Sequence, residues 1–294
     1  MHLRILRAVS AAALAAAALA VAPVSAVDSP AASVATAAPA GSIVVFGDSY
    51  AANPDQIRNV MRKIPGASAA AYENYPSTGG CLQGPDNWPR QLQAQTGIPV
   101  ADWSCSGHNS GHLDGRISTA ITTGDLNPGT RAVVLSVGFN DYWPGSVVEM
   151  HTSYNQAVIQ NAYVANLRAA AAKIRSVAPR AKIIMPGMLS ISEPYGAQMV
   201  CFVNVVPNLP GGVAFPTLQQ VETYTADNQR RAAEEIGARF IDIKAGSRYH
   251  NTCVKDSERW VAGSIDTTTA NYNMSMHPSR AGSAYVASEV ARAL

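Results

Sequence analysis

Three short motifs carry residue types that can cooperate in nucleophilic catalysis. Ser49 lies in the tetrapeptide GDSY, Asn140 lies in GFND, and His277 is followed by Pro278. A serine hydroxyl is a weak nucleophile until an imidazole within hydrogen-bond reach accepts its proton. Attack on an ester builds negative charge on the carbonyl oxygen, which an asparagine side chain can stabilise by hydrogen bonding. If the fold brings these residues together, they predict a serine hydrolase.

The elements around the motifs predict how they are positioned. Five short segments rich in β-branched residues alternate with segments of helical character, and they cover residues 42–46, 98–103, 131–137, 181–185 and 238–243. This alternation predicts a three-layer α/β/α sandwich with a five-stranded parallel sheet. Ser49 follows the first strand and Asn140 follows the third, so we expect both at the edge where open α/β sheets bind ligands.

Two helices have recognisable boundaries in the sequence. Apolar residues at spacings of three and four predict a helix over residues 152–177, which Pro179 would end. After the first strand, Asn53 as N-cap and Pro54 at the first helical position predict a helix that begins just beyond the GDSY loop. The N-terminus of that helix would offer backbone N–H groups to an anion near Ser49.

The order of the motifs carries a family resemblance. A lone GDS is an ordinary turn sequence, but here GDSY, an SCSG segment ending at Gly107, GFND and HP follow one another along the chain. This order resembles the Ser-Gly-Asn-His hydrolases, also called the GDSL esterase and lipase family. The resemblance covers the mature domain and implies a flavodoxin-like fold. It also implies the nucleophile Ser49, the base His277, and an oxyanion hole formed by the Ser49 and Gly107 N–H groups and the Asn140 side chain.

One position departs from the family's pattern. Met274 stands where the family usually carries an Asp three residues before the histidine. An imidazole still needs a partner on its second nitrogen to fix its tautomer. We expect a backbone carbonyl near Met274 to serve, which would make a Ser-His dyad, with Asn273, Ser275 and Asp266 as the alternatives.

Other residues in the motifs have simpler interpretations. We expect Asp48 and Asp141 to accept hydrogen bonds that fix their loops. Tyr50 and Trp143 are candidates for the pocket wall, with core packing as the alternative.

His108 and His112 have a spacing that can place two imidazoles on one helical face. No third ligand lies nearby in the sequence, so we expect no metal. Ester hydrolysis needs only side chains and backbone groups, so no cofactor is expected either.

The cysteines predict two disulfides. Cys81, Cys105, Cys201 and Cys253 are an even number, and none belongs to a C-x-x-C pair. Three pairings are possible, and we favour neighbours in sequence, Cys81 with Cys105 and Cys201 with Cys253. Such bridges stabilise a protein mainly by constraining the unfolded chain.

The two ends of the chain predict an exported single domain. Residues 1–26 combine a basic start, an apolar run and small residues, which is typical of a signal peptide, with an uncleaved anchor as the alternative. Residues 27–40 lack apolar periodicity and predict a flexible lead-in. Residues 41–294 have a length common for one α/β domain.

Two long connections stand out, residues 65–89 and 189–216. Connections of this length without clear secondary structure are often binding loops or lids. The second one is apolar enough to line a pocket for an acyl chain, with packing over the sheet edge as an equal alternative.

Charge and motifs together set the expected function. The formal net charge is +2, and no cluster of Lys or Arg follows the signal peptide, so nucleic acid is not an expected partner. We expect a secreted, monomeric carboxylic-ester hydrolase acting on lipids or acylated small molecules. An acyltransferase of the cell envelope would share the acyl-enzyme. A non-catalytic lipid- or carbohydrate-binding protein is the third possibility, motivated by the missing Asp.

Overall fold

The five predicted strands form one parallel sheet in the computed structural model, which describes residues 37–142 and 155–294. Neighbouring strands are joined in the order β4 (Val100–Asp102), β1 (Ile43–Gly47), β5 (Ala132–Ser136), β6 (Lys182–Pro186) and β9 (Arg239–Ile241). This is the 2-1-3-4-5 order of flavodoxin-like sheets. The predicted sheet is confirmed.

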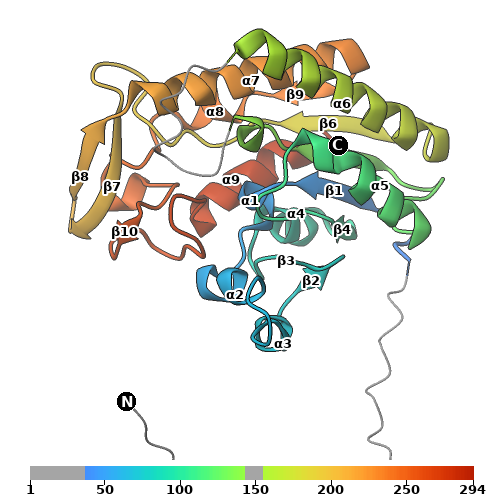
Figure 1. Cartoon of the computed structure of the whole chain (residues 1–294), viewed down its shortest axis with the longest axis horizontal. Coiled ribbons are helices and arrows are strands. Elements are labelled where there is room, and N and C mark those ends of the chain that lie inside the picture. Colours follow the sequence, from blue (N-terminus) through green and yellow to red (C-terminus); the bar gives the residue numbers. More distant parts are fainter. Residues whose placement is uncertain (1–36, 143–154) are drawn as a thin grey trace, which may run out of the picture. The chain divides into compact units, whose positions relative to one another are not determined.

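Helices cover both faces of this sheet (Figure 1). One face packs against α4 (Trp88–Thr96) and α9 (Arg280–Ala291). The other packs against α5 (Leu113–Thr122), α6 (Gln156–Val177) and α7 (Pro216–Ile236). Because both faces are covered, every residue of β1 is buried, as expected for a parallel sheet between two helical layers. The three-layer prediction is confirmed.

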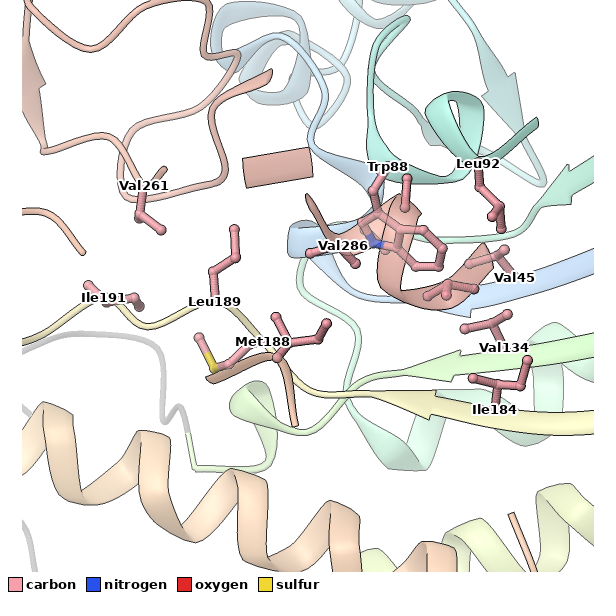
Figure 2. Close-up of a cluster of buried hydrophobic side chains, with 14 of the residues drawn as sticks. Val45, Trp88, Leu92, Val134, Ile184, Met188, Leu189, Ile191, Val261 and Val286 are labelled. Atoms are coloured by element: carbon pink, nitrogen blue, oxygen red, sulfur yellow. The ribbon is translucent and has the colours of Figure 1, made fainter. Parts of the chain in front are cut away.

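The core on the first face shows how the helices attach. Trp88 of α4 and Val286 of α9 face Val45, Val134 and Ile184, which come from three neighbouring strands (Figure 2). Burial of these large apolar side chains contributes about 1.5–3 kcal/mol each relative to exposure. The sheet is therefore a rigid support for the loops at its carboxyl edge.

Both long connections contain regular structure, which the sequence analysis did not predict. The first connection contains α3 (Ser68–Tyr72), β2 (Ser77–Thr78) and β3 (Cys81–Leu82). The helix α2 (Gln56–Met61) precedes it. The second holds a hairpin of β7 (Met199–Val206) and β8 (Leu209–Ala214), which β10 (Ile265–Asp266) extends to a three-stranded sheet. The short helix α8 (Ile243–Ser247) follows β9. Within the described residues, no helix has both the length and the apolar character needed to cross a bilayer.

A short helix that was not predicted precedes the helix expected after the first strand. The short helix α1 (Ser49–Ala52) starts directly after the strand, because the Asp48 side chain accepts the Tyr50 N–H and caps it. Asn53 is the C-cap of α1, in the left-handed conformation with φ 38°, which asparagine tolerates better than most residues. The expected N-cap role of Asn53 is therefore wrong. The helix predicted to follow Pro54 is α2, which begins at Gln56 after its N-cap Asp55, and Ser49 is the first residue of the additional helix α1.

Other predictions near chain boundaries have mixed outcomes. In the long helix, α6 begins at Gln156 after its N-cap Asn155, while the predicted start at residue 152 lies outside the described residues. The predicted signal peptide also lies outside them. Residues 37–40 of the predicted lead-in are described, and Ala38 exchanges hydrogen bonds with Asp125 and Asn127.

Both favoured disulfides are present. Cys81 pairs with Cys105, with Cα atoms 5.2 Å apart, and Cys201 pairs with Cys253 at 5.0 Å. The first joins β3 to the segment that follows β4, and the second joins β7 to the segment that follows α8.

Candidate active site

Ser49 lies where the sheet and α1 meet. The strand ends at Gly47, where a Cβ would lie 2.4 Å from the Cβ of Ala51, so only glycine allows the chain to turn this tightly into the helix. As the first helical residue, Ser49 has a backbone N–H with no intrahelical acceptor. No acceptor for it is found elsewhere in the described part of the chain. This N–H is available to an oxyanion.

His277 is oriented by a backbone carbonyl. Its Nδ1 lies 2.8 Å from the carbonyl oxygen of Ser275. A carbonyl can only accept, so Nδ1 carries the proton and Nε2 is left with a lone pair. Nε2 is buried and has no hydrogen-bond partner among the described residues. The expected carbonyl near Met274 is thus provided by the next residue.

The other groups considered as partners of the imidazole are engaged elsewhere. The amide of Asn273 donates to the Asn53 carbonyl and to the Asp86 side chain. Asp266 accepts hydrogen bonds from Gly263 and Thr269. Both residues therefore hold loops in place.

Burial sets the ionisation of the imidazole. Desolvation lowers the pKa of His277 to about 4, and the hydrogen bond to the Ser275 carbonyl opposes this shift only in part. The ring is consequently neutral at neutral pH, which is the form that can accept a proton from a nucleophile. Tyr50 lies against it, with ring centroids 5.0 Å apart, and donates from its hydroxyl to the carbonyl of Met276 at 2.9 Å.

Asn140 belongs to the same site. It lies in a 3-10 turn, Phe139–Asp141, after β5, and its Nδ2 donates to the carbonyl of His108 at 2.8 Å. Nδ2 carries a second N–H that can point to a ligand. Gly107 adopts φ 87°, a conformation that favours glycine, but it does not line the pocket that holds Ser49. Gly107 is connected to the site through the next residue, His108, whose carbonyl accepts the hydrogen bond from Asn140.

Two carboxylates fix the loops, as expected. Asp48 is buried, and burial raises its pKa to about 7, partly opposed by the hydrogen bond from the Tyr50 N–H. Asp141 accepts from both the N–H and the hydroxyl of Ser110. Neither carboxylate contacts the imidazole of His277, whose Nδ1 is taken by a carbonyl.

Ser49, Asn140 and His277 line one apolar pocket with a volume of about 370 Å³. This volume falls within the roughly 300–1,000 Å³ of small-molecule sites. The remaining lining residues are mostly apolar and come from four parts of the chain: Asp48, Tyr50, Phe139, Ile191, Phe202, Phe215, Leu218, Ser264 and Met276. The pocket therefore combines one polar wall with an apolar interior.

The apolar wall was predicted only in part. Phe202 and Phe215 belong to the connection expected to line an acyl pocket, and both line it. Ile191 also lies within that connection, whereas Leu218 lies just beyond it and was not predicted. Ile191 is held by a buried carboxylate, because Glu222 accepts its N–H at 3.1 Å, and burial raises the pKa of Glu222 to about 7. No sequence motif marks these positions; Tyr50 lies in the wall as expected, and Trp143 lies outside the described residues.

Among the described residues, no metal-ligating group contains both His108 and His112. His108 and His112 stack on each other, with centroids 4.3 Å apart. Within the described residues, the one group with metal-ligating spacing is His108 with Cys81 and Cys105, and these two sulfurs are bonded to each other. A disulfide offers no thiolate ligand.

The pocket at the carboxyl edge of the sheet gathers a serine, an imidazole and an amide, the groups that hydrolysis of a carboxylic ester requires. The GDSL-like Lipase/Acylhydrolase family matches residues 45–285, and the chain therefore belongs to this family. Lipase 2 of Streptomyces coelicolor is 27% identical over 252 residues, covering 78% of this chain and 79% of that protein.

Solved structures share the fold. A phospholipase A1 from Streptomyces albidoflavus has a TM-score of 0.57 at 19% identity, covering 87% of this chain and 99% of that one. An extracellular lipase from Streptomyces rimosus has a TM-score of 0.56 at 18% identity, covering 87% and 100%. None of these findings favours the acyltransferase or the non-catalytic alternative.

Proposed function

We propose that the protein is a secreted esterase or lipase that hydrolyses carboxylic esters with apolar acyl chains through an acyl-enzyme on Ser49. The observation that carries the proposal is the pocket itself. It brings together a serine, an imidazole with an unpartnered buried Nε2, and an asparagine amide, beside a wall of apolar side chains. Ser49 and His277 share no hydrogen bond here, and such contacts often tighten only when substrate binds.

The reaction begins with proton transfer from the Ser49 hydroxyl to Nε2 of His277 as the serine oxygen attacks the ester carbonyl. The negative charge that develops on the carbonyl oxygen is stabilised by the Ser49 N–H and the Asn140 amide, with the Gly107 N–H as a third donor. The imidazolium then protonates the departing alcohol, which leaves an acyl ester on Ser49. Water then gives a proton to Nε2 of His277 and attacks the acyl ester, and the imidazolium returns the proton to the Ser49 oxygen as the carboxylic acid leaves.

The Ser275 carbonyl replaces the usual carboxylate in this cycle. It keeps the Nδ1 proton in place, so Nε2 faces the nucleophile. As a neutral acceptor it stabilises the transient imidazolium less than a carboxylate would. The low pKa of His277 agrees with this arrangement, because neither a carboxylate nor solvent supports the charged ring.

Hydrolysis of p-nitrophenyl esters from acetate to palmitate tests the proposal. Ser49→Ala and His277→Ala should each lower kcat by about 10⁴-fold or more, since the nucleophile and base act as a unit. Ser118→Ala is the matched control, because that hydroxyl donates to the Asp114 carbonyl and accepts from Lys173 of α6, away from the pocket. Turnover by Ser49→Ala equal to that of the wild type would remove Ser49 from the mechanism.

Secretion is part of the same proposal. It is supported by the basic and apolar N-terminal sequence, by the two disulfides, and by the extracellular lipase that shares the fold. Protein recovered from the culture medium of an expressing bacterium should begin at Val27. A mass that includes the first residues would contradict the predicted cleavage.

A further inference from the structure

A long uncharged segment forms one side of the molecule. Residues 194–221 contain no Asp, Glu, Lys or Arg, although these types make up 14% of the chain. The segment includes the β7–β8 hairpin, which lies with β10 at one end of the domain, on the left of Figure 1. Soluble surfaces ordinarily intersperse charges of both signs, so this composition needs an explanation.

The small sheet carries exposed apolar side chains on all three of its strands. Six aliphatic side chains, each 41–67% exposed, form what we call the hairpin patch: Val203, Val205, Val206, Leu209, Val213 and Ile265. Four of them adjoin across strands, because Val203 pairs with Ile265 and Val206 with Leu209. Single exposed apolar residues are normal, whereas contiguous ones mark interaction surfaces.

The hairpin patch is continuous with the catalytic pocket. Phe202 precedes Val203 on β7 and lines the pocket, and Phe215 directly follows β8 and lines it as well. Their ring centroids lie 6.3 Å apart. Some residues in and next to the hairpin therefore form the pocket wall, and their neighbours in the chain form the exposed apolar surface.

We propose that the hairpin patch docks the enzyme on the surface of an aggregated neutral lipid, so that an acyl chain passes from the lipid past Phe202 and Phe215 to Ser49. The inference rests on the proposed function, because an apolar surface beside the pocket assists catalysis only if the substrate is an ester with an apolar acyl chain. The six aliphatic side chains gain free energy from burial among acyl chains whatever the headgroup. The charge at the hairpin turn is the Asp256 carboxylate, which accepts the Asn208 N–H at 3.0 Å and would repel an anionic surface. An uncharged patch favours a neutral lipid surface over an anionic one.

The edge of the small sheet disfavours a second copy of the chain as the occupant. β8 is an edge strand, and it contains Pro210, which lacks the N–H that strand pairing requires. The β7–β8 register shifts between Cys201 and Val203 and again between Val203 and Val206. Proline and bulges are devices that protect edges from pairing with another chain. The apolar side chains contact a lipid surface without using the strand edge.

Vesicle flotation tests the docking without catalysis. The mature chain carrying Ser49→Ala is mixed with phosphatidylcholine vesicles, and the bound fraction is measured with and without Val205→Ser and Leu209→Ser together. We expect the pair to lower the partition coefficient about tenfold or more, since two aliphatic contacts are lost. Binding of the parent should change little with salt. The control pair is Ile57→Ser with Val158→Ser, which are as exposed but lie on α2 and α6.

An activity assay separates docking from chemistry. In the active enzyme, the hairpin pair should leave kcat/KM for dissolved p-nitrophenyl butyrate unchanged and lower the rate on emulsified long-chain esters. Equal vesicle binding by the parent and the hairpin pair would overturn the proposal. So would a parent that ignores vesicles but forms dimers that the hairpin pair abolishes, which sedimentation detects. Flotation needs no turnover, so it tests docking alone. Failure of the proposed function would appear separately, as absence of hydrolysis of dissolved p-nitrophenyl butyrate by the active enzyme.

Discussion

The proposed nucleophile, Ser49, and the proposed base, His277, are held by two different kinds of structure. Ser49 and Asn140 lie just beyond β1 and β5, two neighbouring central strands whose every residue is buried. His277 lies in irregular chain between β10 and α9. The sheet positions the first pair through packing and register. The base depends on single hydrogen bonds.

The hydrogen bonds around His277 come from several segments. The Ala262 N–H donates to the His277 carbonyl at 3.1 Å, and the Met276 N–H donates to the Gly263 carbonyl at 3.2 Å. Asn53, just after α1, donates from its side chain to the carbonyl of Pro278 at 2.9 Å. The base loop is therefore attached to the chain that carries the nucleophile.

This difference shows how the imidazole of His277 is oriented without the Asp that the family usually carries. A carboxylate at residue 274 would orient the imidazole through one side chain. Here Met276 adopts φ 61°, a left-handed conformation that is unusual for a non-glycine residue, and the Ser275 carbonyl meets Nδ1. Backbone geometry does what a side chain usually does, so its accuracy depends on everything that holds the loop.

We call Ser49 and Asn140, with the strands that hold them, the sheet side of the site, and the loop that holds His277 the loop side. On the sheet side, the largest expected loss of activity comes from replacing Asn140. Replacing it with Ala removes a donor to the oxyanion and should lower kcat about 10²–10³-fold, with little change in KM. Steady-state kinetics on p-nitrophenyl butyrate measures both. Asn161→Ala, at an exposed position of α6, is the matched control. An effect confined to KM would mean that Asn140 binds substrate and does not stabilise the developing charge.

The loop side makes its own prediction about pH. Protonated His277 cannot accept the serine proton, so kcat/KM should be lost as the pH falls through about 4, where an ordinary histidine would cause loss near 6.5. The expected fall is about tenfold at pH 3, because one proton is involved. Tryptophan fluorescence at each pH checks that the chain stays folded.

Asp48 allows the two sides to be told apart in the same experiment. Its pKa is raised to about 7, so a change in activity near neutral pH that disappears in Asp48→Asn belongs to the sheet side. An acid limb near 6.5 that persists in Asp48→Asn would show that His277 is not desolvated as the structure has it.

The same contrast separates what the sequence could predict from what it could not. The sheet, its strands and the meeting of Ser49 with Asn140 follow from local patterns, because motifs at the ends of parallel strands gather at one edge. The place of His277 followed from the family resemblance, because it lies at the end of no strand of this sheet. The disulfides follow from the number and order of the cysteines. Whether Gly107 completes the oxyanion hole stays a prediction, since it does not line the pocket.

The features that were missed depend on tertiary contacts or on competing local signals. The helix α1 was not predicted because it has only one turn, and the N-cap of the next helix was misplaced because Asn53 and Asp55 are both good caps. The β7–β8 hairpin was missed because bulges interrupt the alternation of its side chains. The choice of the Ser275 carbonyl follows from a left-handed Met276, which no residue type encodes.

Tyr50 joins the two sides, and its hydroxyl gives the finest test of the comparison. It follows the nucleophile in α1 and donates to the carbonyl of Met276, next to the base. Burial raises its pKa well above 10, so the hydroxyl keeps its proton over the working pH range. We therefore assign it as a positioning residue that ties the loop of His277 to the helix of Ser49.

Tyr50→Phe keeps the ring against His277 and removes only this hydrogen bond. Loss of one neutral hydrogen bond should lower kcat about three- to tenfold, with KM nearly unchanged. The rate of labelling by a fluorophosphonate should fall by the same factor, because it reports the same attack by Ser49. Tyr72→Phe removes a similar bond to the Gly80 carbonyl away from the site and should leave both rates unchanged. If Tyr50→Phe lowers the melting temperature but neither rate, the hydroxyl only stabilises the fold, and the loop holds the base without help from the nucleophile's helix.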